Sequence, residues 1–384
     1  MKVQKTIVWL PSELLSEIFK RLPVKTLLKL RIVCKSWNSV ISDPIFHQEH
    51  LHRFRKENKQ ESNNYILSCE NRDLPTMNVR SSQTLKIIEK IDLGKFRYGT
   101  SSIVGYVDGV LLIHISSPRV NNGVNVIFLW NPTIGKIVDI PPYESLKKRR
   151  DVNFGYGFDS VSNVYKVVAV NLKYYESKTK VYNLSSRSWT SPKQTSCFID
   201  NVVYLSKSSR TINFQGGIYW LARDKSKGKS LTHYLRFNLS SETFNCLKLP
   251  DFKHEPGLKQ RRRRLSVLYE SIALVDCSGV RYSGHVRVWV TRKDITNKVD
   301  SWVELYKLDL WRKSLVFLKS NGDVYLRRAR TILVYGLQTM EEKSRFETNS
   351  EITFMDDYTE SLVLLGQPTN NLFRLVSSKF LNVA

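Results

Sequence analysis

The residues best suited to metal chemistry are three closely spaced histidines, His47, His50 and His52. His47 and His50 would share one face of a helix, and imidazole nitrogens are common zinc ligands. A zinc site needs a full set of ligands at a recognisable spacing, and no cysteine or carboxylate completes this one. The histidines therefore predict no metal site, and we expect no cofactor.

The segment Gly155-Tyr156-Gly157 has the first two glycines of a nucleotide-binding loop of the form G-x-G-x-x-G. Ser160 takes the place of the third glycine, so we expect a β-turn rather than a phosphate cradle. The sequence also lacks the G-x-S-x-G, H-E-x-x-H and Walker patterns. No residue is marked as a nucleophile with its base, and we expect a chain that is not an enzyme.

Two basic runs, residues 147–150 (KKRR) and 261–264 (RRRR), are the densest charges of a chain with 60 Lys and Arg against 35 Asp and Glu. The formal charge of +25 suits acidic proteins, RNA or anionic lipid and does not choose among them. Because both runs lie in polar or proline-containing sequence, we expect solvated loops; the alternatives are a nuclear-import signal and an anion-binding loop for an acidic target. Tyr174, Tyr175 and Trp311 could stack on bases, but no recognisable nucleic-acid fold surrounds them, and we expect them in a sheet surface or core.

The N-terminal part of the chain, residues 10–41, is predicted to form three short helices. Their apolar side chains fall at helical spacing: Leu14, Leu15, Ile18, Phe19 and Leu22 in the first, Leu27, Leu28 and Leu30 in the second, and Trp37, Val40 and Ile41 in the third. Ser12 can cap the first helix and Pro23 ends it, and a further helix is expected from Pro44 to about Leu51. So short a segment cannot bury all of this surface, which predicts a face for a partner's helices; an ordinary helical core is the alternative.

After a polar stretch at 52–64, short apolar or alternating runs separated by turn residues indicate an all-β domain. Residues 130–137, 182–189 and 237–244 share one plan: an aromatic residue, Asn, turn residues and then an apolar residue. They lie 52 and 55 residues apart, and fainter copies follow at 288–289 and 334–337. A period near 50 residues with about four strands is the size of a kelch-type propeller blade. An irregular β-sandwich is the alternative.

The compartment is indicated by the cysteines and the apolar runs. Five cysteines are widely spaced and form no C-x-x-C pair, which is typical of a reducing compartment. The apolar run at 7–10 is far too short for a signal-peptide core, and no later window approaches about 18 apolar residues. We therefore expect a soluble chain in the cytoplasm, the nucleus or both, without a membrane partner.

Residues 10–37 resemble an F-box in the form typical of plant F-box proteins. The resemblance lies in the successive motifs Leu10-Pro11-x-Glu13-Leu14-Leu15, Ile18-Phe19-x-x-Leu22-Pro23-Val24-Lys25-Thr26-Leu27 and Arg31-x-Val33-Cys34-Lys35-x-Trp37. Later motifs resemble the F-box-associated domain of the same proteins: Val104-Gly105-Tyr106-x-Asp108-Gly109, Trp130-Asn131-Pro132-Thr133-x-Gly135-Lys136, residues 155–168 and Gly216-Gly217-x-Tyr219-Trp220-Leu221. This second resemblance weakens after about residue 310, which leaves the number of blades open.

The two resemblances imply an α+β multidomain chain. A small three-helix F-box (8–51) would be followed by a polar linker (52–64) and a large all-β, propeller-like, kelch-type domain (65–384). The implied function is a non-catalytic substrate receptor of an SCF-type (Skp1–cullin–F-box) ubiquitin ligase, whose β domain captures an unknown target protein for ubiquitination and degradation.

The resemblance also implies the residues that bind a Skp1-like adaptor, and through it a cullin. They are Leu10, Pro11, Leu14, Leu15, Ile18, Leu22, Pro23, Val24, Leu27, Cys34 and Trp37. Whether Cys34, Trp37, Val40 and Ile41 contact the adaptor or close the helical core stays open. The alternative function is a basic propeller that binds nucleic acid or another anionic partner without a ligase role, although we do not expect a nucleic-acid partner.

Overall fold

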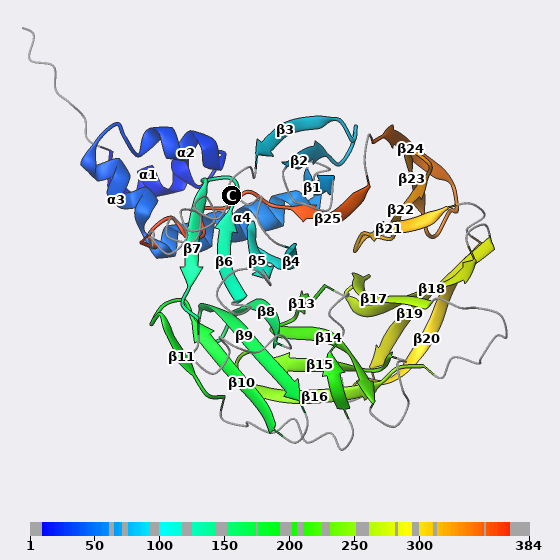
Figure 1. The fold of residues 1–384 in the computed structure, drawn as a ribbon. Helices are drawn as coiled ribbons and strands as arrows, with labels where there is room; N and C mark the ends of the chain where they lie inside the picture. The colour runs from blue at the N-terminus through cyan, green and yellow to red at the C-terminus, as the bar shows by residue number, and fades with distance from the viewer. Residues whose placement is uncertain are drawn as a thin grey trace, which may run out of the picture.

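The computed structural model of the chain shows a group of helices beside a ring of β-sheets (Figure 1). It describes residues 10–60, 65–70, 76–92, 100–116, 125–142, 152–173, 176–192, 202–205, 210–224, 231–250, 261–280, 283–293, 299–309, 313–348 and 351–368. The basic run at 147–150 and the aromatic residues Tyr174, Tyr175 and Trp311 lie outside the described residues. The predictions made for them stay predictions.

The helical part contains α1 (Ser12–Phe19), α2 (Val24–Leu30), α3 (Lys35–Ser42) and α4 (Pro44–Gln60). The three short helices are confirmed, but α4 runs well past Leu51, so residues 52–60 of the predicted polar linker are helical. The prediction that Ser12 caps α1 is wrong, because Pro11 holds the N-cap position and the Ser12 hydroxyl donates to Glu13 instead. None of the helices in the described ranges is both long and apolar enough to cross a membrane.

Six antiparallel sheets form the ring, and within each blade the strands are named from the innermost outward. Blade one is β25 (Ile352–Tyr358), β1 (Tyr65–Glu70), β2 (Thr76–Ser81) and β3 (Ile87–Asp92); blade two is β4 (Thr100–Val107), β5 (Val110–Ser116), β6 (Asn125–Asn131) and β7 (Lys136–Ile140); blade three is β8 (Val152–Asp159), β9 (Val164–Lys173), β10 (Glu176–Asn183) and β11 (Ser188–Thr190). Blade four is β12 (Val202–Leu205) and β13 (Ile212–Phe214), which both pair with β14 (Gly217–Asp224), then β15 (Leu231–Asn238) and β16 (Thr243–Lys248). Blade five is β17 (Arg261–Leu268), β18 (Ser271–Val280), β19 (Ser283–Lys293) and β20 (Val299–Asp309), and blade six is β21 (Ser314–Leu318), β22 (Asp323–Arg328), β23 (Thr331–Gly336) and β24 (Glu342–Glu347).

The ring closes through β25, the last strand in the described residues, which pairs with β1, the first strand described. Blade one is therefore built from both ends of the propeller sequence. The predicted propeller is confirmed and has six blades, and the sandwich alternative is wrong.

The repeated aromatic-Asn motif ends the third strand of blades two, three and four. Trp130, Tyr182 and Phe237 are buried between sheets. In each blade the following Asn side chain accepts a hydrogen bond from the N–H two residues later, at 3.0, 2.8 and 3.0 Å, which forms the turn to the next strand. The fainter copies at 288–289 and 334–337 fall on β19 and at the end of β23, the third strands of blades five and six.

Two turn or loop predictions are wrong for reasons of packing. Gly155 and Gly157 lie within β8, and a Cβ at Gly155 would stand 2.6 Å from the side chains of Ile218 and Trp220. These glycines thus allow blade four to pack closely on blade three.

The run 261–264 is not a solvated loop, because it begins β17 and pairs along its length with β18.

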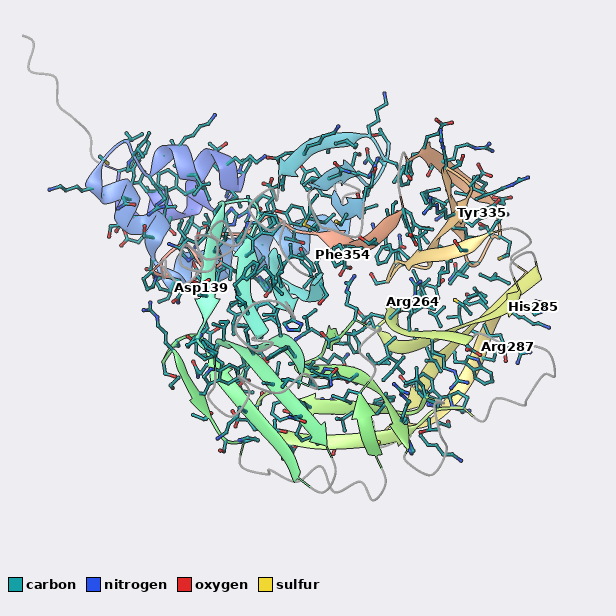
Figure 2. All side chains as sticks on the ribbon, in the orientation of Figure 1. Asp139, Arg264, His285, Arg287, Tyr335 and Phe354 are labelled. Atoms are coloured by element: carbon teal, nitrogen blue, oxygen red, sulfur yellow. The ribbon has the colours of Figure 1, made fainter. Side chains whose placement is uncertain are left out.

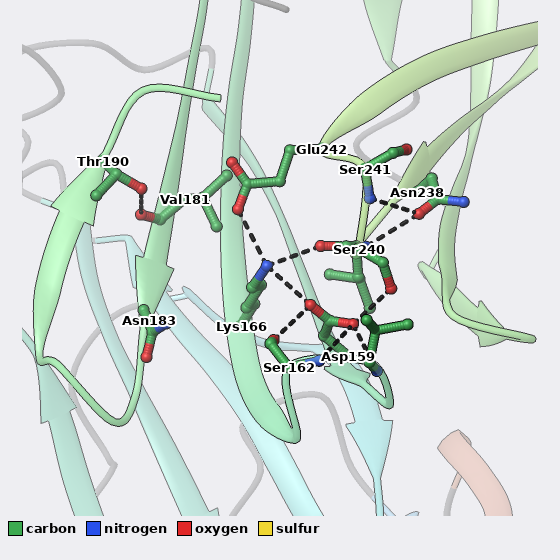
Figure 3. A network of polar contacts seen from close by, with 12 residues as sticks. Asp159, Ser162, Lys166, Val181, Asn183, Thr190, Asn238, Ser240, Ser241 and Glu242 are labelled. Atoms are coloured by element: carbon green, nitrogen blue, oxygen red, sulfur yellow. Dashed lines mark hydrogen bonds and ion pairs between the residues drawn. The ribbon is translucent and has the colours of Figure 1, made fainter. Parts of the chain in front are cut away.

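A buried ion network joins blades three and four (Figure 3). The Lys166 ammonium lies 3.0 Å from both the Asp159 and the Glu242 carboxylates and donates to the Leu239 carbonyl at 2.8 Å. Burial alone would raise the pKa of Asp159, but hydrogen bonds from Ser162, Ser240 and Lys166 outweigh it and hold the pKa well below its usual range.

Candidate partner-binding surface of the helical domain

Three large apolar side chains at four-residue spacing form an exposed apolar stripe. Two of them lie on α1, and the third lies two residues before its start. They are Leu10, Leu14 and Ile18, with exposed fractions of 49%, 52% and 47%. Ile32 and Val33, in the connection between α2 and α3, are also exposed. Scattered single apolar residues are normal on a surface, whereas a line of neighbouring ones is a candidate binding surface.

The structure divides the eleven predicted adaptor-binding residues into three groups. The exposed ones are Leu10, Pro11, Leu14, Ile18 and Pro23; the half-buried ones are Leu22, Cys34 and Trp37; the buried ones are Leu15, Val24 and Leu27. The buried three pack in the helical core, so they can support the surface but cannot contact a partner without opening that core. Ile41 is buried in the same core and Val40 packs against it.

Polar contacts fix α1 on the rest of the helical domain. The Lys20 ammonium lies 2.7 Å from Glu17 and 2.8 Å from Glu49 of α4, and these two hydrogen bonds raise the pKa of Lys20. The hydrogen bond from Lys20 in turn lowers the pKa of Glu17. The stripe therefore lies on a helix that is held from its opposite side.

Two of the three histidines, His47 and His50, serve helix packing in this structure. A ring nitrogen of His47 bonds the Ile41 carbonyl at 2.8 Å, and one of His50 bonds the Leu22 carbonyl at 2.9 Å. Burial lowers the pKa of His47, which favours its neutral form. Within the described ranges, no group of three or more metal-binding side chains comes together.

A segment after β25, residues 359–368, ties the helical domain to blade two, and sequence reasoning missed it. Leu362 is buried in the helical core, whereas Val363 and Leu364 pack in the core of blades two and three. The apolar run 362–365, three polar residues after the end of β25, was the available signal.

The motifs of blade two hold this segment. The Asn131 side chain donates to the carbonyls of Ser361 at 2.9 Å and Val363 at 2.8 Å. The Thr359 N–H donates to the Tyr106 hydroxyl at 2.8 Å. Gly109 has φ +80°, and a Cβ there would lie 2.5 Å from the Thr359 carbonyl oxygen, so only glycine leaves room for the segment.

Side-chain contacts to two more blades complete the attachment. Lys25 of α2 lies 2.5 Å from Glu89 on β3, and Asn163 of the β8–β9 turn donates to Gln48 of α4 at 2.9 Å. The helical domain thus contacts blades one to three, and Figure 1 shows α1 to α3 beside the ring, next to the outer strands β3 and β7. The longer connections between strands, such as 93–99, 143–151 and 251–260, lie outside the described residues.

Comparison with known proteins assigns both parts. Residues 7–49 match the F-box domain family, and residues 59–362 match the F-box associated beta propeller domain family. The F-box/kelch-repeat protein At3g23880 of Arabidopsis thaliana is 28% identical over 254 residues, which cover 63% of this chain and 65% of that protein, just under two thirds of its length. The putative F-box/kelch-repeat protein At3g17280 of the same plant is 29% identical over 318 residues, covering 77% of this chain and 75% of that protein.

Proposed function

This chain belongs to the F-box proteins that carry an F-box associated β-propeller domain, and we propose on that premise that it is the substrate-recognition subunit of an SCF-type ubiquitin ligase. The helical domain would bind a Skp1-like adaptor and through it a cullin, and the propeller would capture the target protein. The observation that carries the proposal is the apolar stripe of Leu10, Leu14 and Ile18, each about half exposed.

The stripe fits a helical protein partner better than a small molecule. Leu14 and Ile18 are one turn apart on α1 and point away from the helical core, so they can enter a groove between a partner's helices. Pro11 and Pro23 bracket the helix and are exposed with it. The buried Leu15, Val24 and Leu27 would keep α1 and α2 in the geometry that the adaptor recognises.

We propose that the chain contributes to ubiquitination by position and not by chemistry. A receptor that holds a target near an enzyme carried elsewhere in the complex raises the effective concentration of the target at that enzyme. The attachment through residues 359–368 supports this role, since it holds the helical domain against the propeller. The target would bind on the propeller, and the location in cytoplasm or nucleus stays a prediction.

A pull-down with a Skp1-like adaptor tests the proposal. Leu14→Asp with Ile18→Asp should abolish binding, because burying an unpaired carboxylate costs on the order of several kcal/mol. Val161→Asp is the matched control: Val161 is an 81% exposed apolar residue in a turn of the propeller, and its replacement should leave binding unchanged. Full adaptor binding by the double variant would show that the stripe is not the docking surface.

The alternative of a nucleic-acid-binding propeller places the phosphate contacts on the run 261–264. Arg263 is largely committed elsewhere, since its side chain lies 3.3 Å from the buried Asp276 carboxylate and also donates to the Leu231 carbonyl. A steep fall of RNA affinity with salt, with a slope that is about one unit smaller in Arg264→Gln, would favour this alternative. Weak, salt-insensitive binding would remove it.

A further inference from the structure

Positive side chains gather inside the ring, on the side formed by the inner strands β21 and β25. These two strands lie against each other. Arg264 of β17 reaches β21, Arg210 reaches β25 from just ahead of β13, and Lys319 follows the end of β21. Figure 2 shows Arg264 and Phe354 on inner strands at the middle of the ring.

Arg210 is partly buried against the inner strand β25 and is still open to water. Its guanidinium donates to the Met355 carbonyl at 3.1 Å, pairs with the Asp356 carboxylate and lies 4.5 Å from the centre of the Phe354 ring. Even so, 32% of its side chain is exposed. Burial and the charge of Arg264 lower its pKa to about 10. A guanidinium held by an inner strand and still about one third exposed faces a water-accessible space inside the ring.

Arg264 has no carboxylate partner within the part of the chain that the structure describes. One of its guanidinium nitrogens donates to the Val316 carbonyl at 3.0 Å, which leaves its other N–H groups available. Arg264 and Arg210 both carry a positive charge. Because the two guanidinium groups share a partly desolvated space, they repel each other. Further along the same side, Lys319 is paired with Asp357 at 3.1 Å.

Among the residues that the structure describes, the charges on this side of the ring do not balance. Arg210 and Lys319 each have a carboxylate partner, and no carboxylate in the described ranges pairs with Arg264. An oxyanion between the two guanidinium groups would accept their free N–H donors in the fork geometry that arginine offers, and would remove their repulsion.

We propose that Arg210 and Arg264 form an oxyanion-binding site within the propeller. The ligand is a carboxylate or phosphate group, held by charge-assisted hydrogen bonds from the two guanidinium groups. It comes either from a free small anion or from an acidic side chain of a protein that enters the ring. The site does not depend on the adaptor surface, which lies on the helices.

Thermal unfolding of the full chain in inorganic phosphate, against chloride of equal ionic strength, tests the site. The midpoint of the wild type should rise in phosphate, and the rise should be lost in Arg264→Gln and partly kept in Arg264→Lys. Arg328→Gln is the control, because Arg328 is an exposed arginine at the end of β22 and should leave the rise intact. Phosphate also stabilises proteins by general exclusion, so the difference between wild type and Arg264→Gln is the informative quantity.

An equal rise in wild type and Arg264→Gln, or no rise in the wild type, would overturn the site. The source of the anion is decided by a second probe, an acetylated hexaglutamate peptide compared with hexaglutamine. Phosphate-sensitive binding of hexaglutamate alone would assign the site to an acidic protein segment; a phosphate response without peptide binding would assign it to a small anion.

Adaptor pull-down separates this inference from the proposed function. Arg264→Gln should bind the adaptor as the wild type does. Leu14→Asp with Ile18→Asp should keep the phosphate response while losing the adaptor. The anion site and the adaptor surface can therefore each be disproved without affecting the other.

Discussion

Lys166 neutralises two carboxylates that belong to adjacent blades, Asp159 of blade three and Glu242 of blade four. Lys166→Met would leave both without their cation, and breaking a buried ion pair from one side costs about 3–5 kcal/mol. The free energy of unfolding should therefore fall by that amount, measured by denaturant titration. Lys343→Met is the control, since Lys343 is half exposed and its pair with Asp323 should contribute less than about 1 kcal/mol. Equal losses in both variants would contradict this account.

The same network predicts a pH dependence. Because the pKa of Asp159 is lowered on folding, its stabilising contribution is complete above its unfolded pKa, about 4, and is lost as the pH falls through the folded pKa. The difference in unfolding free energy between wild type and Asp159→Asn should be constant from about pH 5 to pH 7 and should shrink below about pH 4. A difference that stays the same or grows in acid would show that the carboxylate charge is not what stabilises the contact.

Adjacent residues show what sequence could and could not predict at this scale. Leu14 and Leu15 both fit the apolar pattern of α1, yet one is half exposed and the other buried. Periodicity identifies an apolar face, but it cannot divide that face between core and partner. The division depends on what covers the helix, which here includes Leu362 from the far end of the chain.

At the scale of elements, local signals worked where they were repeated. The aromatic-Asn motif of blades two, three and four indicated the propeller because it repeats in the sequence. It repeats because each copy forms the same turn with the same hydrogen bond. Errors arose where distant contacts decide the conformation. The glycines of β8 are explained by Ile218 and Trp220, some sixty residues away, and the arginines of β17 by pairing with β18. The polar end of α4 has no apolar stripe that would distinguish it from a linker.

The segment after β25 gives a test at the scale of elements. Gly109→Ala should destabilise the protein and release residues 359–368 to protease, because the new Cβ meets the backbone oxygen of Thr359. Gly135→Ala is matched to it: its φ is also positive, at +62°, but no atom lies within 4 Å of the added carbon. This control should cost only the backbone strain, about 1–2 kcal/mol, and should leave the segment protected. Equal protease sensitivity of the two variants would mean that Gly109 does not serve the segment.

At the scale of the whole molecule, the helical domain and the propeller have a shared interface. Leu362 packs among the helices, its neighbours Val363 and Leu364 pack among the blades, and Asn131 holds the segment between them. The F-box is therefore held on the propeller by residues 359–368, which follow the ring-closing strand β25. An adaptor bound at the stripe would be held beside the propeller.

Hydrogen–deuterium exchange of the full chain with Asn131→Ala tests whether residues 359–368 hold the helical domain on the propeller. Losing the Asn131 amide leaves two buried carbonyls without their donor, at about 1–3 kcal/mol, so exchange should rise in residues 359–368 and in α1 to α4 together. Asn183→Ala removes the same turn-forming oxygen from blade three, but the described contacts of Asn183 stay within its own turn, at Ser185 and Ser186. Its effect should be confined to the β10–β11 turn. If Asn131→Ala also changed only its own turn, the helices would be held to the ring independently of this segment, and the attachment of the helical domain to the propeller would rest on Lys25–Glu89 and Gln48–Asn163 instead.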